Sequence, residues 1–359
     1  MVGLVIGVMR SVWLGPLSIT ASTQSVKVNI NSTLSQLIAE LYQQKLIEHP
    51  WFLKRIAVIE GYSDRLRYGE YRLTTGMNAA QLLENIVKGK AMLQHQITFI
   101  EGWTFSKVLA ELNADPDVRH TLRGKTDAQL KSIFGYPAVV PNGQFFPDTY
   151  HFVWGNSDVT ILKRAHAKMQ RVLDQAWADR EPGLPYNTPY QALIVASLIE
   201  SEVSLPSERP IVASVIVNRL RKGMRLQIDT TVLFAMGRPY GTRLLHRDLR
   251  FKSEYNTYLH YGLPPAPIAM PSAGSIEAAV HPVRTTYLYY VARGDGSHRF
   301  STTYKGQIQG IKEYRQFQQG ASGSLQQQKL ELKVLYSDIA AHWLDWGSSV
   351  LFFSVGVLR

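Results

Sequence analysis

The feature that most constrains this chain is an uninterrupted run of apolar or small residues at 192–199, followed directly by Glu200. Thr188 is a suitable helix N-cap, and Pro189 suits the first turn because its missing N–H would have no partner there. A helix without a polar face must be buried on all sides. A carboxylate at its end is partly removed from water, which is costly unless it is paired or protonated. The pattern therefore predicts a buried helix that presents Glu200 as a general acid.

A second acid, Glu202, follows Glu200 by two positions. Two helical positions are separated by about 200° around the axis, so the two carboxylates cannot both face one scissile bond. The alternative interpretation is that both acids are solvated at a helix end, which is the usual position of glutamate.

The segment 224–229 alternates apolar and polar residues, which predicts a strand after a second helix. We expect its apolar residues to face inward, and Arg225, Gln227 and Asp229 to share the opposite face. A buried helix with an acid, a second helix and a strand lined by polar groups would form a cleft of the kind that binds sugars.

The run Tyr255-Asn256-Thr257-Tyr258 combines two aromatic rings with an amide. Rings can stack on sugars, and the amide can bond to an N-acetyl group. The alternative interpretation of this run is a turn closed by Asn256.

Several of these segments resemble the YceG-like family of endolytic murein transglycosylases, over about residues 24 to 315. The residues that carry the resemblance are Leu198-Ile199-Glu200-Ser201-Glu202, Ser207-Glu208-Arg209, Asn218-Arg219-Leu220, Gly223-Met224-Arg225-Leu226-Gln227-Ile228-Asp229, Tyr255-Asn256-Thr257-Tyr258 and Gly262-Leu263-Pro264-Pro265-Ala266-Pro267-Ile268.

The resemblance implies that Glu200 is the catalytic acid, the first glutamate of a helix-end Glu-x-Glu motif. It also implies non-hydrolytic cleavage of the β-1,4 bond between N-acetylmuramic acid and N-acetylglucosamine in nascent strands, leaving a 1,6-anhydro end. Our candidate substrate-binding residues are Gln227, Asp229, Tyr255, Asn256 and Tyr258. We expect no cofactor and no metal; the expected partners are peptidoglycan glycan strands, with peptidoglycan synthases at the membrane as candidates.

The expected fold class is α+β, with a small module followed by a larger mixed catalytic domain that holds Glu200 in a cleft. Strand, helix, helix and strand signals at 24–97 resemble a LysM-like domain, a module that binds N-acetylated glycans in other proteins. The catalytic domain is expected at 98–320, and 321–359 is a C-terminal tail that departs from the family.

Residues 1–20 are apolar but interrupted by Arg10, and the run is shorter than the about 20 residues that span a bilayer. The family carries one N-terminal transmembrane helix. We therefore expect a shortened anchor, a location at the bacterial inner membrane, and a catalytic domain that faces the periplasm or cell wall.

The 359-residue chain has no cysteine, which excludes disulfides and thiolate metal sites. Its 39 Lys and Arg against 28 Asp and Glu give a net charge of +11, which suits an anionic membrane or an acidic wall polymer. A positive net charge would also suit binding to nucleic acid. The sequence contains no nucleic-acid-binding motif, however, and we expect no nucleic-acid partner.

Two other functions remain open from the residues. A muramidase-like hydrolase would use Glu200 and Asp229 as a pair of carboxylates. A non-catalytic glycan-binding scaffold would act through the N-terminal module.

Overall fold

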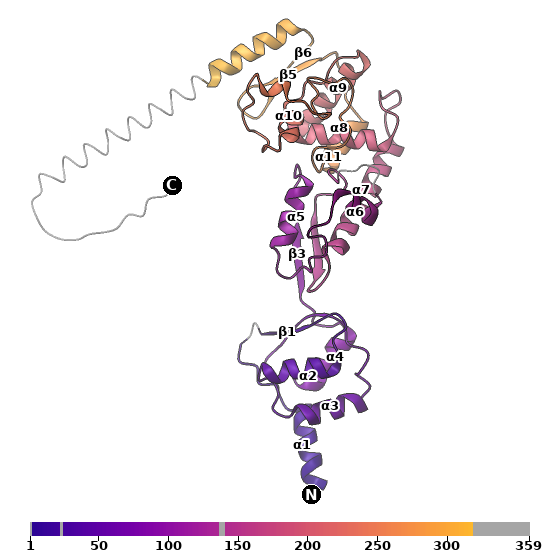
Figure 1. Ribbon diagram of the computed structural model, residues 1–359, viewed down its shortest axis with the longest axis vertical. Coiled ribbons are helices and arrows are strands. Elements are labelled where there is room, and N and C mark those ends of the chain that lie inside the picture. Colours follow the sequence, from indigo (N-terminus) through magenta and orange to yellow (C-terminus); the bar gives the residue numbers. More distant parts are fainter. Residues whose placement is uncertain (1, 22–23, 136–140, 319–359) are drawn as a thin grey trace, which may run out of the picture. The chain divides into compact units, whose positions relative to one another are not determined.

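The structure is a computed structural model that describes residues 2–21, 24–135 and 141–318. The predicted tail at 321–359 lies outside the described residues. The chain divides into two compact units, Met1–Val283 and Arg284–Arg359. Helices and small antiparallel strand pairs make up both units, so the α+β class is confirmed (Figure 1).

The first helix, α1 (Val2–Leu14), comprises 13 residues. Among the helices that the structure describes, none combines the length and the apolar character needed to cross a bilayer.

The small N-terminal module has the predicted order of strand, helix, helix and strand. Its elements are β1 (Ser25–Val28), α2 (Leu34–Gln43), α3 (Pro50–Ile59), β2 (Gly69–Arg72) and the additional helix α4 (Ala79–Lys88). Thr33 and Asn78 begin α2 and α4 as capping boxes, in which the N-cap side chain and the third helical residue bond to each other's backbone. β1 and β2 pair antiparallel.

Tyr71 shows how the module is held together. Its side chain is fully buried, and its hydroxyl donates to the carbonyl oxygens of Arg67 at 2.9 Å and Ile86 at 3.2 Å. Tyr71 therefore packs inside the module, and its ring is not exposed to a ligand. The LysM-like identity of the module stays a prediction.

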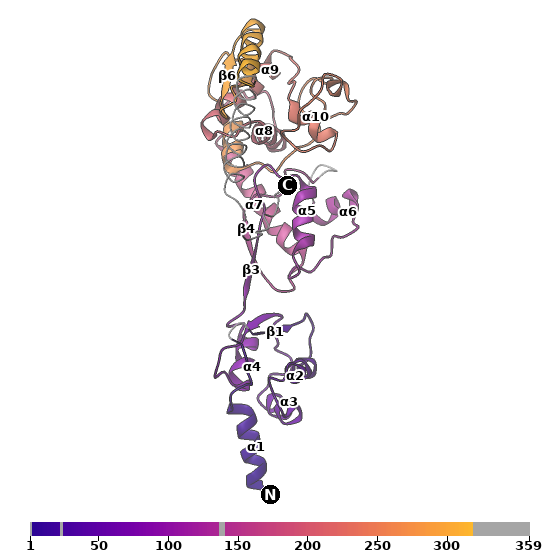
Figure 2. The same cartoon turned by 90° about the vertical axis from the view of Figure 1, so that its left-hand side faces the viewer.

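A middle layer follows, in which an antiparallel strand pair packs on three helices around one apolar core. The elements are β3 (Gln94–Thr98), α5 (Phe105–Ala114), α6 (Asp127–Phe134), β4 (Thr149–Val153) and α7 (Asp158–Ala178) (Figures 1 and 2). Asn142 and Gly143 form a turn, as is typical of an Asn-Gly pair. Asn142 Oδ1 accepts from the backbone N–H of Phe105 at 2.8 Å, and Gly143 adopts a φ of 76°.

The largest helical group surrounds α8 (Pro189–Glu202), the helix that carries both acids. It packs against α7, α9 (Arg209–Arg221), α10 (Asp229–Ala235) and α11 (Ala273–Val280) (Figure 1). All residues from Ala192 to Ile199 are buried, as a helix with no polar face requires.

The second unit contains a hairpin of β5 (Tyr289–Ala292) and β6 (His298–Ser301). Asp295 closes its turn by accepting from the backbone N–H of Ser297 at 2.9 Å. Asp295-Gly296 in this turn is a pair typical of hairpin connections.

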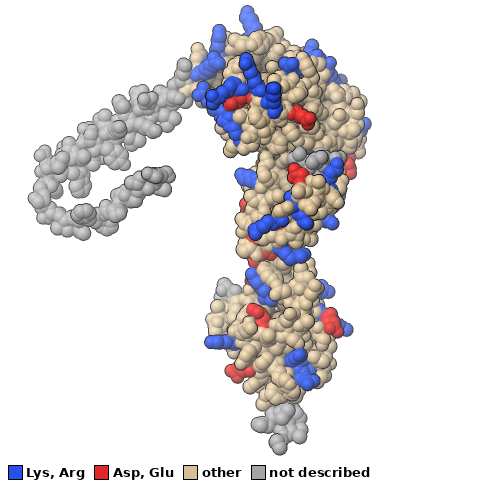
Figure 3. Space-filling model, in the orientation of Figure 1, with Lys and Arg blue, Asp and Glu red and all other residues tan. Residues whose placement is uncertain are grey.

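The basic residues are dispersed on the face that Figure 3 shows, where Lys and Arg side chains lie in separate small groups among uncharged and acidic residues. A net charge of +11 is therefore not gathered into one stripe on that face.

Candidate functional site

Glu200 lies in the last turn of α8, and its side chain is only 7% exposed. The helix begins as predicted: Thr188 accepts from the backbone N–H of Gln191 at 3.2 Å, and Pro189 occupies the first turn. Because the preceding turns of α8 are buried on all sides, the packing of the helix fixes where the Glu200 backbone lies.

The Glu200 carboxylate is held by Ser272, the N-cap residue of α11. Glu200 Oε2 accepts from the backbone N–H of Ser272 at 2.9 Å and from its hydroxyl at 2.5 Å. The same hydroxyl oxygen accepts from the backbone N–H of Ser275 at 3.3 Å, which caps the helix. The carboxylate therefore lies at the positive end of the α11 dipole.

Arg209 faces the other carboxylate oxygen. Its Nη2 lies 3.6 Å from Glu200 Oε1 and 3.9 Å from Glu101 Oε2. Gly274 leaves room for the guanidinium, because a Cβ at that position would lie 2.6 Å from Arg209 Nη1. The result is a carboxylate with one oxygen fixed by Ser272 and the other beside a cation.

The sequence analysis missed Ser272 and Arg209. Arg209 stood inside a segment that carried the family resemblance, and Ser272 had the signal of an N-cap before the small-residue helix 273–280. Neither signal indicates the approach to Glu200: Ser272 is 72 residues away along the chain, and Arg209 belongs to the next helix, whose packing against α8 is a tertiary contact.

Glu202 points to a different neighbour, as the helical spacing predicted. Its Oε1 accepts from the hydroxyl of Thr230 in α10 at 2.7 Å. Thr230 Oγ1 also lies 2.9 Å from Ser201 Oγ. The two acids of the motif therefore have separate environments, one at the start of α11 and one against α10.

The predicted strand at 224–229 is absent from the described structure. The burial alternation is present, with Leu226 and Ile228 buried and Gln227 exposed, but Gln227 has a φ of 49° and Asp229 already begins α10. A positive φ takes the backbone out of the β region, so no regular ladder can form through Gln227.

Gln227 and Asp229 nevertheless lie beside the predicted aromatic run. The backbone N–H of Gln227 donates to the Thr257 carbonyl at 3.1 Å. The hydroxyl of Tyr258 donates to Asp229 Oδ1 at 2.5 Å. Burial, followed by the charge of Asp229, raises the pKa of Tyr258 above its ordinary range, so this hydroxyl is a donor at neutral pH.

Asn256 does not face the solvent. It is fully buried; its amide donates to the carbonyl oxygens of Leu249 at 3.1 Å and Phe251 at 2.8 Å, and its Oδ1 accepts from the backbone N–H of Tyr258. The geometry matches the alternative interpretation, a turn closed by Asn256, and leaves no exposed amide atom for a sugar. Tyr255 is half-buried, with its ring 4.9 Å from that of Phe234.

A cavity of about 820 Å³ opens beside this cluster, between α5, α6 and the loop after α10. Phe234, Trp103 and Tyr240 are among its lining residues, whereas Glu200 is not. Arg209 lies near both Glu200 and Glu101, and Glu101 directly precedes Gly102, which lines the cavity.

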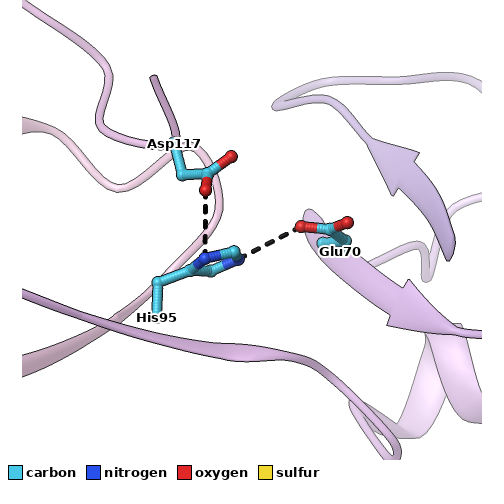
Figure 4. Close-up of side chains that lie close together, drawn as sticks. All are labelled: Glu70, His95 and Asp117. Atoms are coloured by element: carbon cyan, nitrogen blue, oxygen red, sulfur yellow. Dashed lines mark ion pairs between the residues drawn. The ribbon is translucent and has the colours of Figure 1, made fainter. Parts of the chain in front are cut away.

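A separate cluster of Glu70, His95 and Asp117 joins β2, β3 and the segment after α5 (Figure 4). His95 Nε2 lies 3.1 Å from Glu70 Oε2, and its Nδ1 lies 3.1 Å from Asp117 Oδ2. Ser25 donates to the other oxygen of Glu70, and Lys27 pairs with the other oxygen of Asp117 at 3.2 Å. The two ring nitrogens face different carboxylates rather than one point, which describes an ion-pair network better than a metal site.

Comparisons with known proteins agree with this architecture. The YceG-like family model matches residues 26–313. An endolytic murein transglycosylase of Bacillus subtilis is 30% identical over 302 residues, which cover 79% of this chain and 83% of that protein. An endolytic murein transglycosylase of Streptococcus pneumoniae is 24% identical over 300 residues, covering 75% of this chain and about half, 54%, of that protein.

A solved structure of a putative yceG-like protein from Listeria monocytogenes shares the fold with a TM-score of 0.51 at 24% identity. The match covers 80% of this chain and 98% of the other. The family model covers most of the chain, so the family predicted from the sequence is confirmed: this chain belongs to the YceG-like family.

Proposed function

We propose that this chain is an endolytic murein transglycosylase that cleaves the β-1,4 bond between N-acetylmuramic acid and N-acetylglucosamine and leaves a 1,6-anhydro end. Relatives that bear this name support the activity. The observation that carries the chemistry is the setting of Glu200: a carboxylate 7% exposed, anchored through Oε2 by Ser272, with Oε1 beside Arg209.

In the proposed reaction Glu200 serves both proton transfers. As an acid it donates a proton to the glycosidic oxygen while the bond from that oxygen to C1 of the muramyl sugar breaks. As a carboxylate it then accepts the proton of the muramyl 6-hydroxyl, whose oxygen bonds to C1 and closes the anhydro ring. No water is consumed, and the enzyme returns to its starting protonation state.

The surrounding groups have distinct proposed roles. Ser272 positions the carboxylate, and Arg209 stabilises the charge that appears on Glu200 after the first transfer. Gln227, Asp229, Tyr255 and Tyr258 bind the sugars, supported by the exposure of Gln227 and Asp229 and by the bond between Tyr258 and Asp229. Asn256 contributes indirectly, because it fixes the backbone of the aromatic run.

A hydrolase remains the second candidate because Asp229 is an exposed carboxylate on the element next to α8. In that case Asp229 would assist an attacking water, and the product would have a reducing end instead of an anhydro end.

The proposal extends to the remaining parts of the chain. The module at 24–97 is a LysM-like glycan-binding domain, supported by its strand–helix–helix–strand order. The chain acts at the bacterial inner membrane, with the catalytic domain at 98–320 facing the periplasm or wall, where its substrate lies, and beside peptidoglycan synthases.

The test uses the purified chain and long, uncrosslinked glycan strands, with products identified by mass spectrometry. We expect internal cleavage with anhydro ends, which are lighter by one water than reducing ends. Glu200→Gln is nearly isosteric and should lower the rate by about 10²–10⁴-fold, the usual contribution of a general acid or base.

Glu202→Gln is the matched control, because Glu202 bonds to Thr230 and not to Ser272. It should retain most of the activity. If the wild type produced reducing ends and the Asp229→Asn variant did not, the chain would be a hydrolase. If the Glu200→Gln variant cleaved strands as fast as the wild type, Glu200 would not be the acid.

A further inference from the structure

We propose that the cavity between α5, α6 and the loop after α10 binds the acidic peptide branch of the muramyl sugar. The inference rests on the proposed function, since it assigns a part of the same substrate to a site that lies beside Glu200. It concerns substrate recognition and not the bond that is cleaved.

The size and the walls of the cavity suit a peptide. Its volume of about 820 Å³ lies within the range of about 300–1,000 Å³ that is typical of ligand sites. Apolar surface comes from the side chains of Trp103, Phe105, Leu109, Leu130 and Phe234. Such walls can pack against the aliphatic parts of a short peptide.

The rim of the cavity carries cations without acidic partners. Lys107 and Lys125 line it, and neither forms an ion pair within the described residues. The ammonium group of Lys107 lies over the ring of Trp103, 4.8 Å from its centroid, a contact that leaves its charge without an acidic partner. The third cation, Arg238, is already paired with Asp248 at 3.0 Å, and among the described lining residues the one acid is Asp127. Two exposed ammonium groups are therefore available for the carboxylates of a ligand.

The cavity and the Glu200 site share one stretch of backbone, residues 268–272. On the cavity side, Trp103 O accepts from the backbone N–H of Met270 at 2.8 Å, and Tyr240 donates to the carbonyl of Ile268 at 2.8 Å. Ser272, which holds Glu200, follows Met270 by two residues, a span of at most about 7 Å. The cavity wall at Trp103 and Tyr240 is thus bonded to the backbone segment that ends at Ser272, the residue that holds Glu200.

The structure of the muramyl sugar explains why a peptide-binding cavity would lie near Glu200. In a muramyl sugar the peptide branch starts from the lactyl group at O3, on the same ring as C1 and the 6-hydroxyl that react at Glu200. The branch carries free carboxylates. A cavity with apolar walls and two ammonium groups that have no acidic partner, lined by residues bonded to the segment that holds Glu200, is therefore complementary to this branch.

The experiment compares two substrates, peptide-bearing glycan strands and the same strands after an amidase has removed the peptides. In the Lys107→Gln/Lys125→Gln variant we expect KM for peptide-bearing strands to rise about fivefold or more, since two exposed charge pairs are lost. KM for peptide-free strands and kcat for both substrates should stay unchanged. The difference should shrink at high salt, which screens exposed charges.

Lys163→Gln is the matched control, because Lys163 is an exposed lysine on α7 outside the cavity. It should leave KM for both substrates unchanged. An equal rise in KM for both substrates in the double variant, or no rise for either, would overturn the inference.

Binding of a soluble N-acetylmuramyl pentapeptide, compared with N-acetylmuramic acid alone by calorimetry, separates this inference from the proposed function. Binding that depends on the peptide and on the two lysines would support the subsite even if the wild type cleaved no strand. Cleavage by the wild type, together with peptide binding that the double variant retains in full, would refute the subsite and leave the enzyme assignment intact.

Discussion

Replacing Ser272 with alanine separates the two roles that its hydroxyl has in this structure. The hydroxyl oxygen accepts from the backbone N–H of Ser275 and so caps α11, while the hydroxyl proton is donated to Glu200 Oε2 at 2.5 Å. The first role stabilises the fold, and the second positions the carboxylate that we propose as the catalytic acid.

The expected magnitudes follow from these contacts. Loss of a serine N-cap costs about 0.5–2 kcal/mol of unfolding free energy. A hydrogen bond to a charged group contributes about 1.5–3 kcal/mol, but Glu200 keeps its bond to the Ser272 backbone N–H at 2.9 Å in the variant. We therefore expect Ser272→Ala to lower kcat about tenfold, which corresponds to about 1.4 kcal/mol of the activation barrier.

Ser157→Ala is the matched control, because Ser157 caps α7 by accepting from the backbone N–H of Thr160 at 3.1 Å and has no contact with Glu200. Thermal unfolding should show a similar loss of stability in both variants, whereas cleavage of glycan strands under saturating substrate should be slowed only in Ser272→Ala. The reasoning fails if the two variants have equal kcat, or if Ser272→Ala loses stability and keeps full activity.

Two further predictions follow from single contacts. Gly274→Ala would place a Cβ 2.6 Å from Nη1 of Arg209, so we expect the flexible guanidinium to move away from Glu200. The value of kcat should then fall, while the midpoint of thermal unfolding changes little. An unchanged kcat would show that Arg209 does not assist the reaction. Burial raises the pKa of Tyr71 from 10.0 to about 12, so the folded state holds this proton more tightly than the unfolded state. The stabilisation that comes from the buried, protonated Tyr71 hydroxyl is complete below about pH 10 and is lost as the pH rises toward about 12. The unfolding free energy of Tyr71→Phe, measured by urea titration, should therefore fall less steeply over this pH range than that of the wild type. An equal slope in the two proteins would contradict the assignment.

The local patterns of the sequence determined much of the fold. The run at 192–199 has no polar face, which required burial on all sides, and α8 is buried in this way. The N-terminal module followed from helical spacing, N-cap residues and the glycine after α4, because these signals act within a few residues. The divergence of Glu200 and Glu202 followed from helix geometry.

The alternation at 224–229 shows where local pattern was insufficient. It correctly indicated that Leu226 and Ile228 are buried, whereas Met224 is only partly buried. A period of two also fits an irregular extended segment. The φ of 49° at Gln227 and the start of α10 at Asp229 depend on contacts with Thr257 and Tyr258, which lie far along the chain.

The same distinction holds at the candidate site. The sequence predicted Glu200 as the acid, from its place at the end of an apolar helix and from the family resemblance. Only the tertiary structure brought Ser272 and Arg209 to its two oxygens, and only the structure showed that the Asn256 amide is committed to the backbone of its own loop. The chain itself fixes periodicity and capping, whereas the partners of a buried polar group are decided by how distant segments pack.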